Sequence, residues 1–409
     1  MSAEMTPMRW PVAWRDPSTL TLIRDTCINY LLMDNPGELK SVVEVARQRG
    51  VQVAAVPPSG FSLVKGEWPG IRMSRSGKEG EADAGPTGEP WVDSNGWRIA
   101  LETAMHPGVP VWVDAAPPEG GVPASAYLIA MADAATYQGR WILTLAAGLA
   151  EDVASRKADA VQAWKQLVSA SSFFAERKLS AQYLPRAVVG AISDFAGENE
   201  SLSQEVLNML ARANQQYRVI PKKDLSAASL DGLRAIVYVD IGLPGAALRA
   251  QMLRFVEAGG LLVTRQKWHP LADNTPWKTD EHPRFSIAGL GKGRVAVAKE
   301  DPDDPYLLAN DSVTLVSRRY DLLRFWNFGP VGSRLTCAED QRKAAAQIVS
   351  FAEPGVYGPT VWVAGGYRKA RLWTYDRVGA SDVETEIHDG GLEVHLPPIS
   401  VYAEVELET

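Results

Sequence analysis

The amino-acid sequence predicts a multidomain α/β protein of three consecutive domains, and three observations along the chain predict it. Short apolar segments alternate with helical segments through residues 1–183, as in repeated βα units. Strands of near-continuous hydrophobicity alternate with helices over residues 184–300, which is typical of a parallel sheet covered on both faces. Over residues 301–409, apolar and polar residues alternate between glycine turns, which indicates an antiparallel β-sandwich.

The N-terminal domain is predicted to be a truncated, TIM-barrel-like (β/α) domain. Its predicted strands are 9–14, 28–34, 51–58, 71–75, 109–116 and 139–145. Helical patterns separate most of them, among them GELKSVVEVARQRG and WRIALETAMHPG. A complete barrel of this kind takes about 250 residues and eight strands, so about six strands indicate a degenerate barrel.

In such barrels the chemistry lies at the carboxyl ends of the strands, so the residues there are candidate site residues. Trp14 follows the first predicted strand. Asp34 and Asn35 follow the second, and Asp114 ends the strand VPVWVD. We expect Asp114 to act as a catalytic carboxylate if the protein is an enzyme, with Asp34 in reserve and the other two in substrate binding.

A second group of candidates lies in GPTGEPWVDSNGW, residues 85–97, within a long segment rich in Gly, Pro and Ser. Loops of that length are usually functional or disordered. Its side chains form the aromatic, carboxylate and amide mixture that a sugar requires: Glu89, Trp91, Asp93, Asn95 and Trp97. In an enzyme, Glu89 or Asp93 is the partner expected for the catalytic carboxylate. Alternatively, the loop is fixed by its own tryptophans, and Asp93 and Asn95 cap the next helix.

Arg140 and Trp141 begin the last predicted strand of this domain, in ATYQGRW. Arg140 is a candidate for substrate binding, and the alternative is a structural ion pair with Asp114. Trp141 offers a further aromatic face for a sugar.

Composition excludes several classes of function. A net charge of −7 gives no basic footprint for nucleic acid. Two distant cysteines and histidines without ligand spacing predict neither a metal site nor a cofactor. No apolar run reaches the length of a membrane span. MSAEMTPMRW lacks the features of a signal peptide, so the cytoplasm is the default expectation, and the periplasm or secretion applies if a precursor was trimmed.

The middle domain carries a resemblance to a known family. Its strands and helices are AVVGAISDF, NESLSQEVLNMLARAN, YRVIP, LRAIVYVD, ALRAQMLRFVEAGG and LLVT. The run VYVDIGLPGAALRAQMLRFVEAGGLLVTRQ resembles the flavodoxin-like, class I glutamine-amidotransferase-like fold, in the version used as the trimerisation domain of family 42 β-galactosidases. GKGRVAVAK resembles the strand that closes that domain. The resemblance implies a fold and a possible homo-oligomer through this domain. It implies no glutaminase, because Cys27 and Cys337 lie outside it.

The C-terminal domain is predicted from its turns. HDGG between ETEI and LEVHL predicts a hairpin. LPPISVYAEVELE resembles the end of the small C-terminal β-domains of many glycosidases. EDQRKAAAQIVSFA, residues 339–352, predicts one inserted helix.

The domain order resembles that of family 42 β-galactosidases, which implies a glycoside-hydrolase-like protein that handles carbohydrate. A retaining mechanism needs two carboxylates about 5–5.5 Å apart, and no strand here ends in an Asn-Glu acid/base pair. One alternative is therefore a non-catalytic sugar-binding protein or oligomeric scaffold. Another is an amidotransferase-fold hydrolase in which Ser193, beside Asp194, is the nucleophile.

Overall fold

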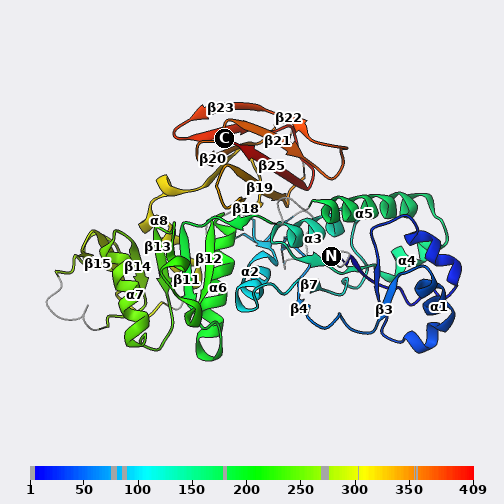
Figure 1. Ribbon diagram of the computed structural model, residues 1–409, viewed down its shortest axis with the longest axis horizontal. Helices are drawn as coiled ribbons and strands as arrows, with labels where there is room; N and C mark the ends of the chain where they lie inside the picture. The colour runs from blue at the N-terminus through cyan, green and yellow to red at the C-terminus, as the bar shows by residue number, and fades with distance from the viewer. Residues whose placement is uncertain are drawn as a thin grey trace.

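The computed structural model describes residues 5–74, 81–84, 90–177, 182–268, 276–302, 304–353, 355 and 358–409. Figure 1 shows the N-terminal region at the right, the middle region at the left and the C-terminal strands above the junction between them. The expectation of a mixed α/β multidomain protein is confirmed, because parallel and antiparallel sheets occupy separate parts of the chain.

The parallel strands of the N-terminal region are β1 (Pro7–Arg9), β2 (Tyr30–Leu32), β3 (Gln52–Ala54), β4 (Ser62–Lys65), β7 (Val111–Asp114), β8 (Arg140–Trp141) and β9 (Leu143–Thr144). They pair in the orders β3-β2-β1-β9 and β4-β7-β8. Only Ile142 separates β8 from β9, and its N–H donates to the Val113 carbonyl at 2.9 Å. The pairing therefore continues from one group to the other. With β8–β9 counted as one strand, six parallel strands lie among the described residues of the N-terminal region, as many as the sequence predicts there.

One of these strands is not the predicted one. Instead of joining the parallel strands, the predicted strand at 71–75 contributes to β5 (Gly70–Ile71), which pairs antiparallel with β6 (Val92–Asp93). The strand that takes its place is β4, inside the long segment expected to be a loop. The apolar signal of β4 is only Leu63 and Val64, and the Gly and Pro around it hide so short a signal.

The first strand is also shifted from the prediction. β1 ends at Arg9 instead of running through 9–14. Pro11 has no N–H to donate to a neighbouring strand, so the ladder stops before it. The shift brings Arg9 to the carboxyl end of the strand.

The helices of this region are α1 (Lys40–Gln48), α2 (Gly96–Met105), α3 (Ala124–Thr136), α4 (Ala147–Ala154) and α5 (Ala158–Glu176). α1 buries Val42, Val43 and Ala46, which form one stripe at helical spacing. Phe351 and Tyr402 from the C-terminal region complete the same hydrophobic core. The N-terminal region therefore packs against the C-terminal strands directly.

The middle region has one six-stranded sheet in the order β12-β11-β13-β14-β16-β15. Its strands are β11 (Val189–Ser193), β12 (Tyr217–Pro221), β13 (Ala235–Tyr238), β14 (Leu261–Thr264), β15 (Phe285–Leu290) and β16 (Gly293–Ala298). All are parallel except β15, which pairs antiparallel with β16. The predicted strands YRVIP and LLVT match β12 and β14 residue for residue.

Helices cover both faces of this sheet, as the hydrophobic runs predict. α6 (Glu200–Arg212) and α8 (Pro305–Val316) pack on one face, where Ala235 and Val237 of β13 contribute to their core. α7 (Ala246–Glu257) packs on the other face with Ile236 and Tyr238. The alternation follows from the period of two along a strand.

Two features of the helices correct the prediction. α8 was not predicted; Asp304 is its N-cap, and the side chain of Asp304 accepts from the Tyr306 and Leu307 N–H groups. The helix expected over 339–352 is wrong, because residues 343–350 form a strand instead. Alanine has the highest helix propensity, but propensity is a small energy for each residue, and pairing with neighbours on both sides of this strand outweighs it.

The C-terminal strands form two antiparallel sheets around one hydrophobic core. One sheet has the order β10-β18-β19-β25-β21-β22, and the other β17-β20-β24-β23. Their strands are β10 (Leu184–Pro185), β17 (Leu323–Trp326), β18 (Val331–Cys337), β19 (Lys343–Ser350), β20 (Thr360–Ala364), β21 (Lys369–Trp373), β22 (Ser381–Asp382), β23 (Glu384–His388), β24 (Gly391–His395) and β25 (Tyr402–Glu408). The predicted hairpin is confirmed: Asp389 and Gly390 join β23 to β24 with φ of 48° and 76°.

Across the described ranges, no helix combines the length and the apolar character needed to cross a membrane.

Candidate functional site

The carboxyl ends of three N-terminal strands meet around Arg9. Its guanidinium contacts Asp34 at 2.7 Å and Asp114 at 2.5 Å. The structure therefore brings together two of the predicted carboxylates through a residue that sequence analysis missed. A charged residue at the end of a buried strand was the signal for Arg9. Asn35 lies beside this group, exposed, and makes no side-chain cap for the turn that follows it.

One oxygen of each carboxylate accepts a hydrogen bond from the Arg9 guanidinium. Asp34 is 65% exposed and Asp114 is 23% exposed, so Asp114 is the more enclosed partner. A glycosidase needs one carboxyl group that donates a proton and another that attacks or activates water. Charge-assisted bonds to one guanidinium instead hold both groups as acceptors.

The 85–97 loop lies only partly within the described residues; Glu89 lies outside them. Asp93 binds Arg72 through two hydrogen bonds, of 3.0 and 2.5 Å. Asn95 is 1% exposed, and its amide pairs with the backbone of Glu67 through two bonds of 2.8 Å. Neither side chain caps α2 as the structural alternative supposed. Instead, the Ser94 hydroxyl accepts from the Gly96 N–H at 3.2 Å.

A buried carboxylate supports this loop. Asp133 of α3 accepts from the Ser94 hydroxyl at 2.6 Å and from the Asn95 N–H at 2.7 Å. Burial raises the pKa of the Asp133 carboxyl to about 6. The group therefore ties the loop to α3.

The loop tryptophans join the N-terminal and middle regions instead of covering the ends of the strands. Trp97 is 6% exposed and packs with Phe195, Leu207 and Val219 of the middle region. Trp91 is half-buried, and the Arg212 guanidinium lies 3.5 Å from its ring centroid. Neither ring offers an open face at the carboxyl ends of the strands.

The remaining predicted residues are also placed by packing. Trp14 is fully buried, and its indole N–H donates to the Ala150 carbonyl at 2.8 Å. Trp141 is buried in the same hydrophobic core. Arg140 lies opposite Trp112 in the β7–β8 pairing and makes no ion pair with Asp114. It lines a cavity on another side of this region.

The proposed serine nucleophile is enclosed. Ser193 is fully buried, and its hydroxyl donates to Asp240 at 2.5 Å and accepts from the Phe195 N–H at 2.9 Å. Lys222 binds both Asp194 and Asp240, at 2.6 and 2.5 Å. The Ser193 hydroxyl is thus bound to a carboxylate that a lysine holds, and no histidine among the described residues contacts it to act as the base.

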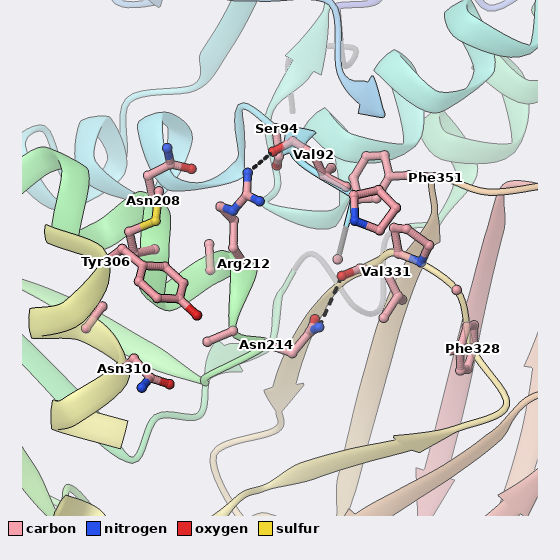
Figure 2. A pocket seen from close by; sticks show the side chains of 18 of the residues that line it. Val92, Ser94, Asn208, Arg212, Asn214, Tyr306, Asn310, Phe328, Val331 and Phe351 are labelled. Carbon is pink, nitrogen blue, oxygen red and sulfur yellow. Dashed lines mark hydrogen bonds between the residues drawn. The ribbon is translucent and has the colours of Figure 1, made fainter. Parts of the chain in front are cut away.

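A cleft of about 400 Å³ lies where the three regions meet (Figure 2). We call it the junction cleft. Most of its polar walls come from α6 and the turn after it, α8 and the 85–97 loop: Ser94, Asn208, Arg212, Asn214, Tyr306 and Asn310. Tyr137 and Arg318 also line it. Phe328 and Phe351 of the C-terminal region supply apolar walls, and Figure 2 shows them opposite Tyr306.

Two hydrogen bonds hold the walls of the junction cleft in place. Arg212 donates to the Val92 carbonyl at 2.7 Å, and the Asn214 amide donates to the Val331 carbonyl at 3.1 Å (Figure 2). These bonds link the end of α6 to the loop, and the turn after α6 to β18. None of the described residues that line the cleft is Asp or Glu. The cleft therefore offers amide, hydroxyl and guanidinium groups beside aromatic rings.

No protein-family model matches the sequence, and no curated protein matches it. Several solved structures align with the chain. The α-L-fucosidase isoenzyme 2 from Paenibacillus thiaminolyticus aligns with 95% of this chain and 78% of its own, at 10% identity and a TM-score of 0.55. A rhamnosidase from Novosphingobium sp. aligns with 91% of this chain and 38% of its own, at 12% identity and a TM-score of 0.52.

A GH42 β-galactosidase from G. stearothermophilus aligns with 91% of this chain and 66% of its own, at 10% identity and a TM-score of 0.47. The fucosidase and rhamnosidase alignments show that this chain has a glycoside-hydrolase-like fold. The chain spans 38% of the rhamnosidase and 66% of the β-galactosidase. A fold hosts many functions, so activity has to be argued from the site.

Proposed function

We propose that the protein binds neutral carbohydrate in the junction cleft, on a glycoside-hydrolase-like scaffold, without hydrolysing it. The scaffold consists of a shortened (β/α) barrel, an amidotransferase-like three-layer domain and a β-sandwich. Support for this division comes from the strand orders of the N-terminal and middle regions and from the shared core of the two antiparallel sheets. Oligomerisation through the middle domain stays a prediction.

The observation that carries the proposal is the chemistry of the junction cleft. Sugar recognition uses amides, hydroxyls and arginine for the hydroxyl groups, and aromatic rings for the C–H faces. Asn208 and Asn310 provide amides, and Tyr306 provides a phenol. Phe328 and Phe351 provide the rings. The described lining has no carboxylate, which favours binding over hydrolysis.

Calorimetry of the full chain tests the proposal against oligosaccharides ending in fucose, rhamnose or galactose. We expect Asn310→Ala and Tyr306→Phe each to weaken binding about 5- to 10-fold, through loss of one hydrogen bond. Thr314→Ala, one turn further along α8 and outside the cleft, is the matched control and should bind as the wild type does. Failure of every glycan to bind at millimolar concentration would end the proposal.

A second function is favoured by one observation, the meeting of Asp34 and Asp114 at Arg9. Carboxyl ends of barrel strands are where such enzymes place their chemistry. Glycosidase activity at this place would make Asp114 the essential carboxylate. Assays with aryl glycosides decide it: activity that falls at least 100-fold in Asp114→Asn supports hydrolysis, and activity that persists removes Asp114 as a catalytic residue.

A further inference from the structure

A larger cavity, of about 920 Å³, lies between the N-terminal parallel strands and the six-stranded antiparallel sheet. We call it the amino-end cavity, because Val111 and Arg140, the first residues of β7 and β8, line it. It is therefore at the opposite end of these strands from Asp114. It shares no lining residue with the junction cleft among the described residues.

Three polar side chains stand in one row on the wall of the amino-end cavity. Arg334 of β18 lies directly opposite Gln347 of β19, and Gln347 lies directly opposite Glu404 of β25. Directly opposite residues in antiparallel strands project from the same face, with their Cβ atoms about 4.5–5.5 Å apart. All three residues line the cavity. The sheet thus presents a guanidinium, an amide and a carboxylate side by side.

Two members of this row have unsatisfied polar atoms. Arg334 is 8% exposed and Gln347 is 4% exposed. Nη1 of Arg334 and Oε1 of Gln347 have no hydrogen-bond partner in the described structure. Burial lowers the pKa of Arg334, although a guanidinium remains charged at neutral pH. Buried polar groups are nearly always paired, and a buried charge without a partner is costly, so both atoms indicate a missing partner.

The two charged residues of the row differ in whether an opposite charge lies beside them. Arg177, at the end of α5, binds both Glu404 and Glu406. The Tyr402 hydroxyl donates to Glu404 at 3.1 Å. Glu404 is therefore matched by a cation, whereas the guanidinium of Arg334 faces the ring of Tyr137 at 5.1 Å from its centroid. The Arg334 end of the row needs an anion.

We propose that the amino-end cavity binds a small polyhydroxy carboxylate of the uronic acid type. Its carboxylate pairs with Arg334, and its hydroxyl groups donate to Oε1 of Gln347. A neutral sugar leaves Arg334 without a counter-charge. A phosphate dianion has a single hydroxyl for the amide and no carbon skeleton for the apolar walls. Phe61 and Phe174 give the cavity apolar walls for the carbon skeleton.

Calorimetry of the full chain with galacturonate and galactose tests the proposal, because the two differ only in the oxidation of C6. We expect galacturonate to bind at least 10-fold more tightly than galactose, and more tightly than inorganic phosphate. Arg334→Met should weaken galacturonate binding at least 10-fold. Arg342→Met, an exposed residue of the same β-hairpin, should bind as the wild type does.

Thermal unfolding supplies a second readout. Without ligand, Arg334→Met should melt above the wild type, because the substitution removes a buried charge that has no partner. Galacturonate should raise the melting temperature of the wild type and leave that of Arg334→Met unchanged. If Arg334→Met does not fold, Gln347→Met decides, with an expected loss of at least 5-fold in affinity.

The proposal is overturned if the wild type binds no galacturonate at millimolar concentration, if phosphate binds as tightly, or if both variants bind galacturonate like the wild type. It is also overturned if galactose binds as tightly as galacturonate and its binding is weakened equally in Arg334→Met, because galactose bound in the junction cleft would not respond to that substitution. Because the two cavities are separate, failure here leaves glycan binding in the junction cleft untouched. Likewise, loss of glycan binding in Asn310→Ala does not test galacturonate binding in the amino-end cavity, because Asn310 lines the junction cleft.

Discussion

The guanidinium of Arg212, at the end of α6, lies 3.5 Å from the ring centroid of Trp91 and donates to the carbonyl of Val92 at 2.7 Å. One side chain therefore joins the middle region to the loop that precedes α2. The same side chain forms a wall of the junction cleft. Binding there is thus coupled to the packing of two regions against each other.

The contact predicts that Trp91 stabilises the protein. We expect Trp91→Ala to lower the free energy of unfolding by about 2–3 kcal/mol, from lost burial and a lost cation–π contact. Chemical denaturation followed by circular dichroism measures it. Trp326→Ala is the matched control, because Trp326 is 42% exposed in β17, and it should cost less than about 1 kcal/mol. Equal costs in the two variants would show that Trp91 does not hold the interface.

A close backbone approach makes Gly293 a sensitive position. A Cβ at this residue would lie 2.1 Å from the Val256 carbonyl oxygen and 2.2 Å from that of Gly260. Gly293→Ala should therefore lower stability by about 3 kcal/mol, because backbone must move. Gly289→Ala in the neighbouring strand β15 meets nothing within 4 Å and is the control. A melting temperature of Gly293→Ala within a degree or so of that control would contradict the prediction.

Asp133 predicts a pH dependence. Its pKa is about 6 in the folded protein against 3.8 for the ordinary group, because burial disfavours the ionised form. The stability it contributes is therefore fully present below about pH 4 and is lost as the pH rises through about 6. The loss is at most about 3 kcal/mol. Asp133→Asn cannot ionise, so the wild type should lose stability relative to this variant between about pH 4 and pH 7.5.

Urea unfolding of both proteins at the two pH values measures the difference, and all other titrating groups cancel in the comparison. A difference that stays constant with pH would mean that Asp133 titrates normally. Ser94→Ala removes one donor to the carboxylate and should enlarge the pH dependence.

The Arg9 group predicts unequal couplings. A double-mutant cycle between Arg9→Met and Asp114→Asn should give a coupling of about 1 kcal/mol, and the cycle with Asp34→Asn should give less than about 0.5 kcal/mol. The reason is exposure: solvent screens Asp34, at 65% exposed, more than Asp114, at 23%. Denaturation at low and high salt checks the ranking, and a larger coupling for Asp34 would reject it.

Local sequence patterns predicted most of the parallel strands well. YRVIP and LLVT are apolar runs bounded by polar residues, and their strands begin and end where the runs do. The C-terminal hairpin at Asp389 and Gly390 follows from a turn that requires positive φ. Local patterns failed where pairing between strands outweighed helix propensity. The alanine-rich segment of β19, for example, is a strand between β18 and β25.

The candidate site was predicted less well, and for a different reason. Trp91 and Trp97 were expected to cover a sugar site, but both pack where the N-terminal and middle regions meet. An aromatic residue in a polar loop has the same local pattern in either role. Which neighbours surround it is decided by segments more than a hundred residues away, such as α6 at Arg212.

The sequence by itself determined the alternation of strands and helices, the parallel character of the middle sheet and the antiparallel strands at the C-terminal end, because these depend on hydrophobic periods within short windows. Only the tertiary structure decided which polar side chains meet. Arg9 and Asp114 are 105 residues apart in the chain, and Arg334, Gln347 and Glu404 come from three strands. Their proximity depends on strand order and register, which no local window of sequence contains.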